Sequence, residues 1–485
     1  MAALLVSLGC VAAFAIAFLL LRIVASANAA VGTAAEGVAA LTSKSLSERE
    51  KEAAVQKAGL RLIVRALGLF LKFAGCLGAA AVPAYLADAF GVVPLSATIA
   101  RLSDPVFLIA TTIAALLIAW LVSALRGRKK PASTANSQAD QILHMIAFVP
   151  KVQKALFGFD NAIYRMFGRK PGNARHVFIT SLARGGTTAC LNAIYSLDEV
   201  ATNTYRDMPF ITAPVVWNGL SGVMGRKTER HERAHGDGLE IDLDSPEAFD
   251  EVFWKLWWPE KYAEDGIALW TPEDRTQKQA RNLEKAFEKT IAVRGRNCRV
   301  YVSKNNANIA RLPLLKAMFP DSVILVPLRR PAPHAASLLR QHRNFVRQQS
   351  EDRFVERYMR DIGHYEFGLA HKPIQFPGFD ASRYDKDDPN YWLCYWISAF
   401  EEVQRQAGMV DLVLQDELRH APDDVMKSLL ARNDIRHDPA TDFSSFFRQA
   451  EDMAEEAVFD PDLLAEANRL YDRLKSARTH SNTSA

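Results

Sequence analysis

VFITSLARGGTT, residues 177–188, combines an apolar run, a tight glycine loop and the start of a helical sequence. The run at 177–179 is short and rich in residues that favour strands. Gly185 and Gly186 allow the backbone to approach a ligand without a Cβ in the way, and the free N–H groups of a helix beginning after them point at the same place. The pattern therefore predicts a strand, an anion-binding loop and a helix in succession.

The composition restricts the classes of protein to which the chain can belong. With 485 residues, 49% hydrophobic and 24% charged, the chain is long enough for one large domain or two, with additional segments. A formal net charge of +4 is small for this length, so we expect no nucleic-acid partner. The cysteines are scattered without CxxC or paired spacing, so we interpret them as reduced thiols: Cys10, Cys76, Cys190, Cys298 and Cys394. No cluster of residues has metal-ligand spacing, so we expect no metal.

The first 130 residues are predicted to anchor the protein in a membrane. Apolar blocks occur at 4–24, 66–90 and 105–125, and each is long enough to cross a hydrocarbon layer of roughly 30 Å. The middle block contains Lys72, which is costly at depth, so a helix hairpin lying partly in the interface is the alternative for it. We therefore expect two or three transmembrane helices within residues 1–130.

Basic residues beside these blocks predict the orientation of the chain. The segment 26–65 and the RGRKK sequence at 126–130 are rich in Lys and Arg, whereas 91–104 has only Arg101. By the positive-inside rule, the N-terminus lies outside and the chain after Leu125 lies in the cytoplasm. We expect an integral protein of the inner or plasma membrane with its globular part in the cytoplasm.

Residues 131–174 are predicted to join the anchor to a globular domain. A polar stretch after Pro131 is typical of a linker, and HMIAFVPKVQKALFGFDNAIYRMFGRK, residues 144–170, is a basic amphipathic segment. Such a segment can lie on a membrane surface, and packing against the globular domain is the alternative.

From residue 175 to 475 the pattern is that of a globular α/β domain. Short apolar runs predict buried parallel strands at 177–181, 299–303, 322–328 and 411–415. Helical sequences at 273–291 and 390–408 lie between or beside them. A doubly wound parallel sheet binds its ligand beyond the carboxyl ends of its strands, which is where the glycine loop falls. Residues 476–485 are expected to form a disordered tail.

The glycine loop differs from the Walker loop of ATPases and nucleotide kinases. The Walker pattern, GxxxxGK[ST], has a leading glycine and a lysine that are both missing here. Instead, Arg184 enters the turn, and Thr187 and Thr188 follow it. A guanidinium can bind a sulfuryl or phosphoryl oxygen, and the two hydroxyls can add to the donors of the backbone.

ITSLARGGTT, residues 179–188, resembles the 5′-phosphosulfate loop of sulfotransferases that use 3′-phosphoadenosine 5′-phosphosulfate (PAPS). That loop commonly reads P-[KR]-[ST]-G-T-T, and here Ala183 and Gly185 stand in place of its proline and its Ser or Thr. A second block, FPDSVILVPLRRPAPHAASLL at 319–339, is similar to the 3′-phosphate block of the same family.

In the family's 3′-phosphate block a strand runs into R-[DN]-P, and a serine follows six residues after the proline. Arg329, Pro331 and Ser337 match this pattern, whereas Arg330 replaces the usual Asp or Asn and either adds a contact or lies on the surface. Looser similarities occur at 304–321, 235–254 and 412–418. The resemblance covers roughly residues 175–420 and points to the bacterial, carbohydrate or tyrosylprotein-like branch, with a P-loop-like fold in which helices flank a parallel sheet.

The resemblance implies transfer of a sulfuryl group from PAPS to a hydroxyl group without a metal. A membrane anchor would suit a glycan, a glycolipid or another lipid-linked acceptor. Arg184 is the candidate for the leaving-group side, and Lys304 is the candidate for a second positive group on the sulfuryl oxygens, with an exposed lysine as its alternative. The residues expected to bind the donor are Arg184, Gly185, Gly186, Thr187, Thr188, Arg329 and Ser337.

The base that takes the acceptor's proton is expected to be Asp207, at about the distance from the first helix where tyrosylprotein-type relatives carry a Glu. A nearby anionic donor would raise the pKa of such a carboxylate. The alternative for Asp207 is a structural salt bridge with Arg206 or another basic group. Asn308 occupies a place where some family members have His. The remaining candidates for the base are His231, His235 and Glu247.

Two further features leave alternatives open. The tryptophans between residues 254 and 270 can stack on sugars, lie at a lipid interface or pack in the core. The aromatic helix that contains Tyr391 and Trp392 is most simply a buried face. A different function also fits the sequence, namely a membrane-tethered nucleotide-binding or scaffold protein without sulfotransferase activity.

Overall fold

The structure is a computed structural model and divides into two compact units, Met1–Pro131 and Ala132–Ala485. The described residues are 2–23, 25–26, 29–30, 33, 48–104, 107, 111, 138–172, 174–223, 231–232, 240–247, 249–447 and 456–482.

In the first unit, the helices are α1 (Ala2–Leu20), α3 (Glu48–Ala89) and α4 (Leu95–Leu102). Two of the described helices, Ala2–Leu20 and the Gln56–Ala89 part of α3, are long and apolar enough to cross a membrane, judged by length and composition. They weakly suggest an association with a membrane.

The second apolar block of the sequence is part of a longer helix. Helix α3 begins at Glu48, so the charged sequence before residue 66 and the apolar block after it form one continuous helix. Lys72 within it donates a hydrogen bond from Nζ to Ser26 Oγ at 2.7 Å, which gives this costly charge a polar partner. The third block, 105–125, lies outside the described residues apart from Phe107 and Thr111.

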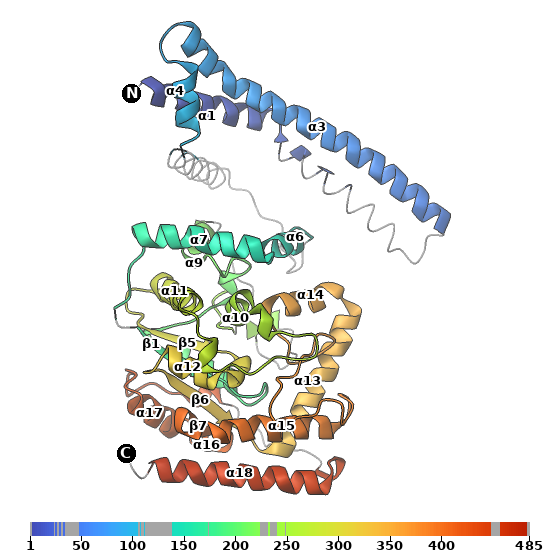
Figure 1. Ribbon diagram of the computed structural model, residues 1–485, viewed down its shortest axis with the longest axis vertical. Coiled ribbons are helices and arrows are strands. Elements are labelled where there is room, and N and C mark those ends of the chain that lie inside the picture. Colours follow the sequence, from blue (N-terminus) through green and yellow to red (C-terminus); the bar gives the residue numbers. More distant parts are fainter. Residues whose placement is uncertain are drawn as a thin grey trace. The chain divides into compact units, whose positions relative to one another are not determined.

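The second unit is built on a five-stranded parallel sheet, seen near the middle of that unit in Figure 1. The strand order is β2 (Val200–Ala201), β5 (Val300–Lys304), β1 (Arg175–Ile179), β6 (Val323–Leu328) and β7 (Asp411–Leu414). The predicted α/β class, with a parallel sheet flanked by helices, is confirmed, and so are all four predicted strands. The two-residue strand β2 was not predicted.

Alternating side chains of the strands form two cores. Val177, Ile179 and Val302 pack with α8 (Thr187–Tyr195) and α17 (Pro422–Arg432) on one face of the sheet. The larger core on the other face includes Phe178 and Tyr301 and the helices α11 (Gln277–Arg294), α12 (Leu312–Met318), α13 (Pro331–Glu351) and α15 (Pro389–Arg405). The sheet is therefore covered on both faces, as expected of parallel strands.

Shorter and peripheral elements complete the unit. They are α6 (Gln138–Ala147), α7 (Pro150–Phe167), α9 (Pro214–Val223), β3 (His231–Glu232), β4 (Glu240–Ile241), α10 (Glu251–Trp257), α14 (Arg353–Ile362), α16 (Gln415–His420) and α18 (Pro461–Asn482). Helix α18 packs along α15 (Figure 1) and continues as far as Asn482, so residues 476–482 are helical where a disordered tail was expected.

The amphipathic segment before the sheet packs one face of α7 against the globular unit. Asp160 of α7 pairs with Lys289 of α11 at 2.9 Å, with both side chains fully buried, and Asp160 Oδ1 accepts the Val216 N–H of α9 at 2.8 Å. Burial lowers the pKa of Lys289 to about 8, against the opposing effect of Asp160. Removing either charge would leave the other buried without its partner. The ion pair fixes α7 to α11, and the hydrogen bond to Val216 fixes it to α9.

The aromatic-rich sequences belong to the core. Trp254, Trp258 and Trp270 are almost completely buried, and Arg311 lies 4.3 Å from the ring centroids of both Trp254 and Trp270. The buried face predicted for the aromatic helix is confirmed in α15 by residues that include Tyr391 and Trp392. These side chains are therefore committed to packing and not to a sugar surface or a lipid interface.

Candidate active site

The glycine loop lies at the carboxyl end of β1, the central strand of the sheet. Thr180 and Ser181 are buried where the strand ends, and Ser181 Oγ donates to the Pro327 carbonyl of β6 at 2.8 Å. Two residues of the loop have left-handed backbones, Arg184 with φ 67° and Gly186 with φ 100°. The second is the N-cap of α8, so the loop turns sharply and delivers the chain into the helix.

The two glycines are required by close packing within the loop. A Cβ on Gly185 would lie 2.8 Å from Ser181 Oγ and 3.0 Å from the Leu182 carbonyl oxygen. A Cβ on Gly186 would meet Gln415 Nε2 at 3.3 Å, on a backbone that L side chains rarely adopt. The glycines therefore let the loop fold back on its own residues and on Gln415, which follows β7, and leave the N-terminus of α8 uncovered by side chains of their own.

The two predicted donor-binding regions are in direct contact. Arg329, which follows β6, donates from Nη1 to the Arg184 carbonyl at 3.0 Å. Arg184 Nε donates to Ser337 Oγ of α13 at 3.4 Å. Arg184 and Ser337 are separated by 153 positions in the sequence, so the fold alone brings them together. Both guanidiniums and the serine hydroxyl therefore belong to one region at the carboxyl edge of the sheet.

His334 is a residue of this region that sequence reasoning missed. It is completely buried in the first turn of α13, and its Nε2 lies 2.8 Å from the Ala183 carbonyl oxygen. Its Nδ1 accepts a hydrogen bond from Trp396 Nε1 at 3.2 Å, which makes Nε2 the donor toward the loop. Its place between Arg329 and Ser337 in the sequence was the available signal. We infer that His334 holds the glycine loop in place through its contact with the Ala183 carbonyl.

Thr187 begins a short chain of hydrogen bonds that leads away from the loop. Its hydroxyl donates to Asn306 Oδ1 at 3.2 Å, and Asn306 Nδ2 donates to Glu366 Oε1 at 3.0 Å. The second oxygen of Glu366 lies 3.3 Å from His364 Nδ1. Thr188, the next residue of α8, is half-buried. A half-buried carboxylate is thus one amide side chain away from the glycine loop, at a residue that the sequence did not single out.

Lys304 ends β5, beside β1, in register with Ile179. Its side chain is buried, in contrast to the alternative of an exposed lysine, and its Nζ lies 3.4 Å from Glu247 Oε1. Tyr205 donates its hydroxyl proton to Glu247 Oε2 at 3.0 Å. Lys304 therefore shares its charge with a carboxylate at the strand end next to the loop.

Asp207 is held in a structural arrangement. It forms an ion pair with Arg294 of α11 and accepts the Thr204 N–H at 2.8 Å, where it caps a short 3₁₀ turn. Burial raises the pKa of Asp207, and Arg294 and the Thr204 amide act in the opposite direction. Arg206 pairs instead with Asp244 at 2.7 Å. The contacts of Asp207 match the alternative proposed for it, a salt bridge with a basic residue.

The other residues singled out from the sequence lie as follows. His231 forms part of β3, and His235 lies outside the described residues. Asn308 is fully buried and donates to Ser303 Oγ at 3.2 Å. Arg330 is exposed and pairs with Asp416 at 2.7 Å. In the described part of the chain, no group of three or more His, Cys, Asp or Glu residues is arranged to hold a metal ion.

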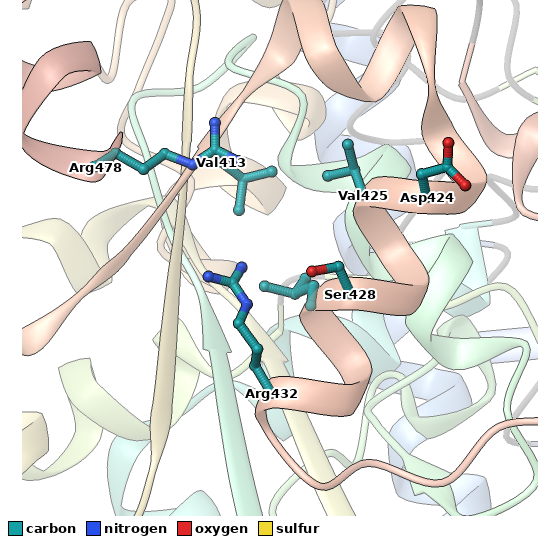
Figure 2. Close-up of a pocket in the computed structure, with 7 residues that line it drawn as sticks. Val413, Asp424, Val425, Ser428, Arg432 and Arg478 are labelled. Carbon is teal, nitrogen blue, oxygen red and sulfur yellow. The ribbon is translucent and has the colours of Figure 1, made fainter. Parts of the chain in front are cut away.

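Two cavities of the second unit differ in their relation to the loop. A cavity of about 30 Å³ is lined by Leu182 and Ala183 of the loop, by Asn306 and by Glu366 and Lys372. A larger one, of about 220 Å³, lies between β7, α17 and α18, where the side chains of Arg432 and Arg478 point into it (Figure 2). None of the predicted site residues lines the larger cavity, so size alone does not identify the site.

A family assignment agrees with this geometry. Residues 176–373 match the model of the sulfotransferase family. Residues 176–373 therefore belong to the sulfotransferase family. No curated protein matches the chain.

Three solved sulfotransferase structures are similar to the chain. The one from Alicyclobacillus acidocaldarius has 13% identity and a TM-score of 0.32, covering 63% of this chain and 96% of its own. One from Mycobacterium tuberculosis has 12% identity and a TM-score of 0.35, covering 72% and 90%. One from Mycobacterium avium has 12% identity and a TM-score of 0.35, covering 69% and 76%.

The matched part of the chain begins in β1 and ends after Lys372. It contains both predicted donor-binding regions, Lys304, and the carboxylates Asp207, Glu247 and Glu366. Strand β7 and the core helix α15 lie beyond it and complete the sheet and its larger core.

Proposed function

We propose that the protein transfers a sulfuryl group from PAPS to a hydroxyl group of an acceptor. The observation that carries the proposal is the contact between the two donor-binding regions, in which Arg329 reaches the Arg184 backbone and Arg184 reaches Ser337. PAPS has anionic groups at both ends of one nucleoside and needs two anion-binding regions within reach of each other. The family match is consistent with this donor.

We propose the following donor-binding roles, which the positions of the side chains support. Gly185, Gly186 and the N-terminus of α8, with Thr187 and Thr188, would bind the 5′-phosphosulfate, and Arg329 with Ser337 would bind the 3′-phosphate. Arg184 would stabilise the charge that develops on the leaving phosphate oxygen. Lys304 would face the sulfuryl oxygens, and Glu247 would hold its ammonium group in place.

The reaction breaks the bond between the sulfur and the phosphate oxygen of PAPS and forms a bond between the sulfur and the acceptor oxygen. Adenosine 3′,5′-bisphosphate leaves with the electron pair of the broken bond. The acceptor hydroxyl loses a proton, which a carboxylate near the loop must take.

We assign the base to Glu366 in preference to Asp207. Glu366 is half-buried, lines the cavity beside the loop and is joined to Thr187 through Asn306. Asp207 is engaged by Arg294 and the Thr204 amide, which leaves it poorly placed to meet an acceptor. Glu247 is the second choice, because its oxygens already face Lys304 and Tyr205.

We propose a glycan, a glycolipid or another lipid-linked molecule as the acceptor, at the cytoplasmic side of the inner or plasma membrane. The two helices long enough to cross a membrane support a location close to such acceptors. The basic segments 26–65 and 126–130 support the orientation.

The activity is tested by incubating the full chain in its membrane with sulfur-labelled PAPS and following adenosine 3′,5′-bisphosphate release and label in glycans and lipids. We expect transfer by the natural chain and its loss in Arg184→Ala. Stabilisation by PAPS without any transfer would favour the nucleotide-binding alternative, and stabilisation by ATP alone would favour a kinase-like site. No stabilisation by either nucleotide would favour the scaffold alternative.

A further inference from the structure

Helix α7 has an exposed face that is both apolar and basic. Its inward residues, which include Phe157, Asp160 and Tyr164, are buried in the second unit. On the outward side, the side chains of Phe159 and Met166 are 42% and 63% exposed. Exposed apolar side chains that lie together and are rimmed by polar residues are typical of a surface that meets a partner or a membrane.

The outward side of α7 carries two neighbouring stripes of residues. At about 100° per residue, Ala155, Phe159, Ala162 and Met166 follow one another along one side of the helix. Lys151, Lys154 and Arg165, all exposed, lie beside them on the same outward surface. Here these seven residues are called the α7 face.

The α7 face carries only positive charge. The one acidic residue in the sequence of α7 is Asp160, which points inward and is paired with the fully buried Lys289. Arg169 and Lys170 continue the basic sequence immediately after the helix and are also exposed. Such a surface is complementary to an anionic partner, and its apolar stripe requires that the partner also offer a hydrocarbon phase.

We propose that the α7 face binds the surface of an anionic lipid bilayer. Phe159 and Met166 would enter the boundary between headgroups and acyl chains, and the long stems of Lys151, Lys154 and Arg165 would extend to the phosphates. A bilayer meets both requirements of the face at once, and α1 and α3 in the same chain have the length and composition to be held in one.

The buried pair of Asp160 and Lys289 gives this contact a consequence for the rest of the unit. It fixes α7 to α11, and Asp160 also binds the backbone of α9. A bilayer that holds the α7 face would therefore hold the second unit in one orientation, and would not merely keep it nearby.

The test uses the full chain in vesicles, with a fluorescent label attached at Phe159→Cys or, in a second variant, at Met166→Cys. Vesicle binding itself is uninformative because α1 and α3 can anchor every variant. The measurement is quenching of the label by a lipid-borne quencher, compared with the same label at Arg281→Cys, an exposed position of α11. The unaltered chain, labelled in parallel, gives the background from its own cysteines.

We expect severalfold stronger lipid-phase quenching at positions 159 and 166 than at 281 when the vesicles contain phosphatidylglycerol. The quenching should fall in phosphatidylcholine vesicles, in high salt and in the Lys151→Gln, Lys154→Gln, Arg165→Gln variant. Equal quenching at all three labels would overturn the proposal. So would labels at 159 and 166 that are shielded from both aqueous and lipid quenchers, since a second copy or another protein would then cover the face.

Discussion

The donor side of the candidate site and the carboxylates around it are positioned by different kinds of contact. Arg184 lies in the loop after β1, and Arg329 follows directly after β6; these strands are parallel neighbours, so the order of the sheet brings the two residues to one edge. Glu247 and Glu366 lie in loops between other elements and reach the strand ends through single side-chain contacts with Lys304 and Asn306. Strand topology therefore determines the donor side, whereas individual loop contacts determine the carboxylates.

Replacing the proposed base should have the largest effect on the reaction. In Glu366→Gln, the amide still accepts the hydrogen bond of Asn306 but takes no proton, so we expect the initial rate of sulfuryl transfer to fall roughly 10²- to 10⁴-fold. PAPS affinity should stay the same, because the donor side is untouched. The measurements are label transfer from PAPS and PAPS binding by calorimetry.

Asp207→Asn is the matched control for that substitution. It leaves Arg294 without its buried carboxylate, so we expect a lower melting temperature and an unchanged rate per folded molecule. A folded Asp207→Asn variant that has lost transfer, beside an active Glu366→Gln variant, would return the role of base to Asp207.

A methyl group in the glycine loop should weaken the binding of PAPS. In Gly185→Ala the new Cβ would press on Ser181 Oγ and the Leu182 carbonyl, and relieving that pressure must move the loop. We expect PAPS affinity to fall by about 1–3 kcal/mol, or roughly 5- to 150-fold. Gly158→Ala in α7, where nothing lies within 4 Å of the new Cβ, should leave affinity unchanged. Equal affinities in the two variants would contradict the role of the loop.

Arg329→Lys should separate the contributions that the two ends of PAPS make to its affinity. Lysine keeps the charge but loses the planar group that also reaches the Arg184 carbonyl, so we expect about tenfold weaker binding of PAPS, or about 1.4 kcal/mol. Adenosine 5′-phosphosulfate has no 3′-phosphate and should lose less affinity in this variant. Arg330→Lys is the neighbouring control. If both ligands weakened equally, Arg329 would act only by holding the loop.

Lowering the pH should produce the smallest effect, a loss of folding stability. That loss limits the pH range in which the variants above can be compared. Burial lowers the pKa of His342 to about 4 and that of His371 to about 3, from 6.5. The unfolded chain then binds more protons below pH 6.5, so the free energy of unfolding falls as the pH falls, by up to about 1.4 kcal/mol per pH unit for each histidine. Melting temperatures between pH 7 and 5 check this, and a constant value would contradict it.

The parts of the fold that the sequence predicted are those with a local pattern. Four strands and the aromatic face of α15 appear as apolar runs or as helical spacing, and they are where expected. Strand β2 has only two residues, too few for a pattern, and α3 extends the apolar block at 66–90 back through a charged stretch to Glu48.

The residues of the candidate site also divide into those that the sequence predicted and those that it did not. Arg184, Arg329 and Ser337 are recognisable because each stands at a fixed distance from a strand end. Glu366 lies 60 positions after Asn306, in a loop with no motif of its own, and only the folded chain shows them in contact. The partner of Asp207, Arg294, is 87 positions away, so sequence spacing could not predict this pair either.

The buried pair between α7 and α11 also constrains how the protein is made. Asp160 leaves the ribosome 129 residues before Lys289 (289 − 160 = 129), so the ion pair that docks the inward face of α7 cannot form until the chain has been synthesised through α11 as far as Lys289. At about 5–20 residues per second, that interval lasts roughly 6–26 s. During it, a carboxylate and several aromatic side chains of α7 have no folded partner, and a nearby membrane or a chaperone could shield them.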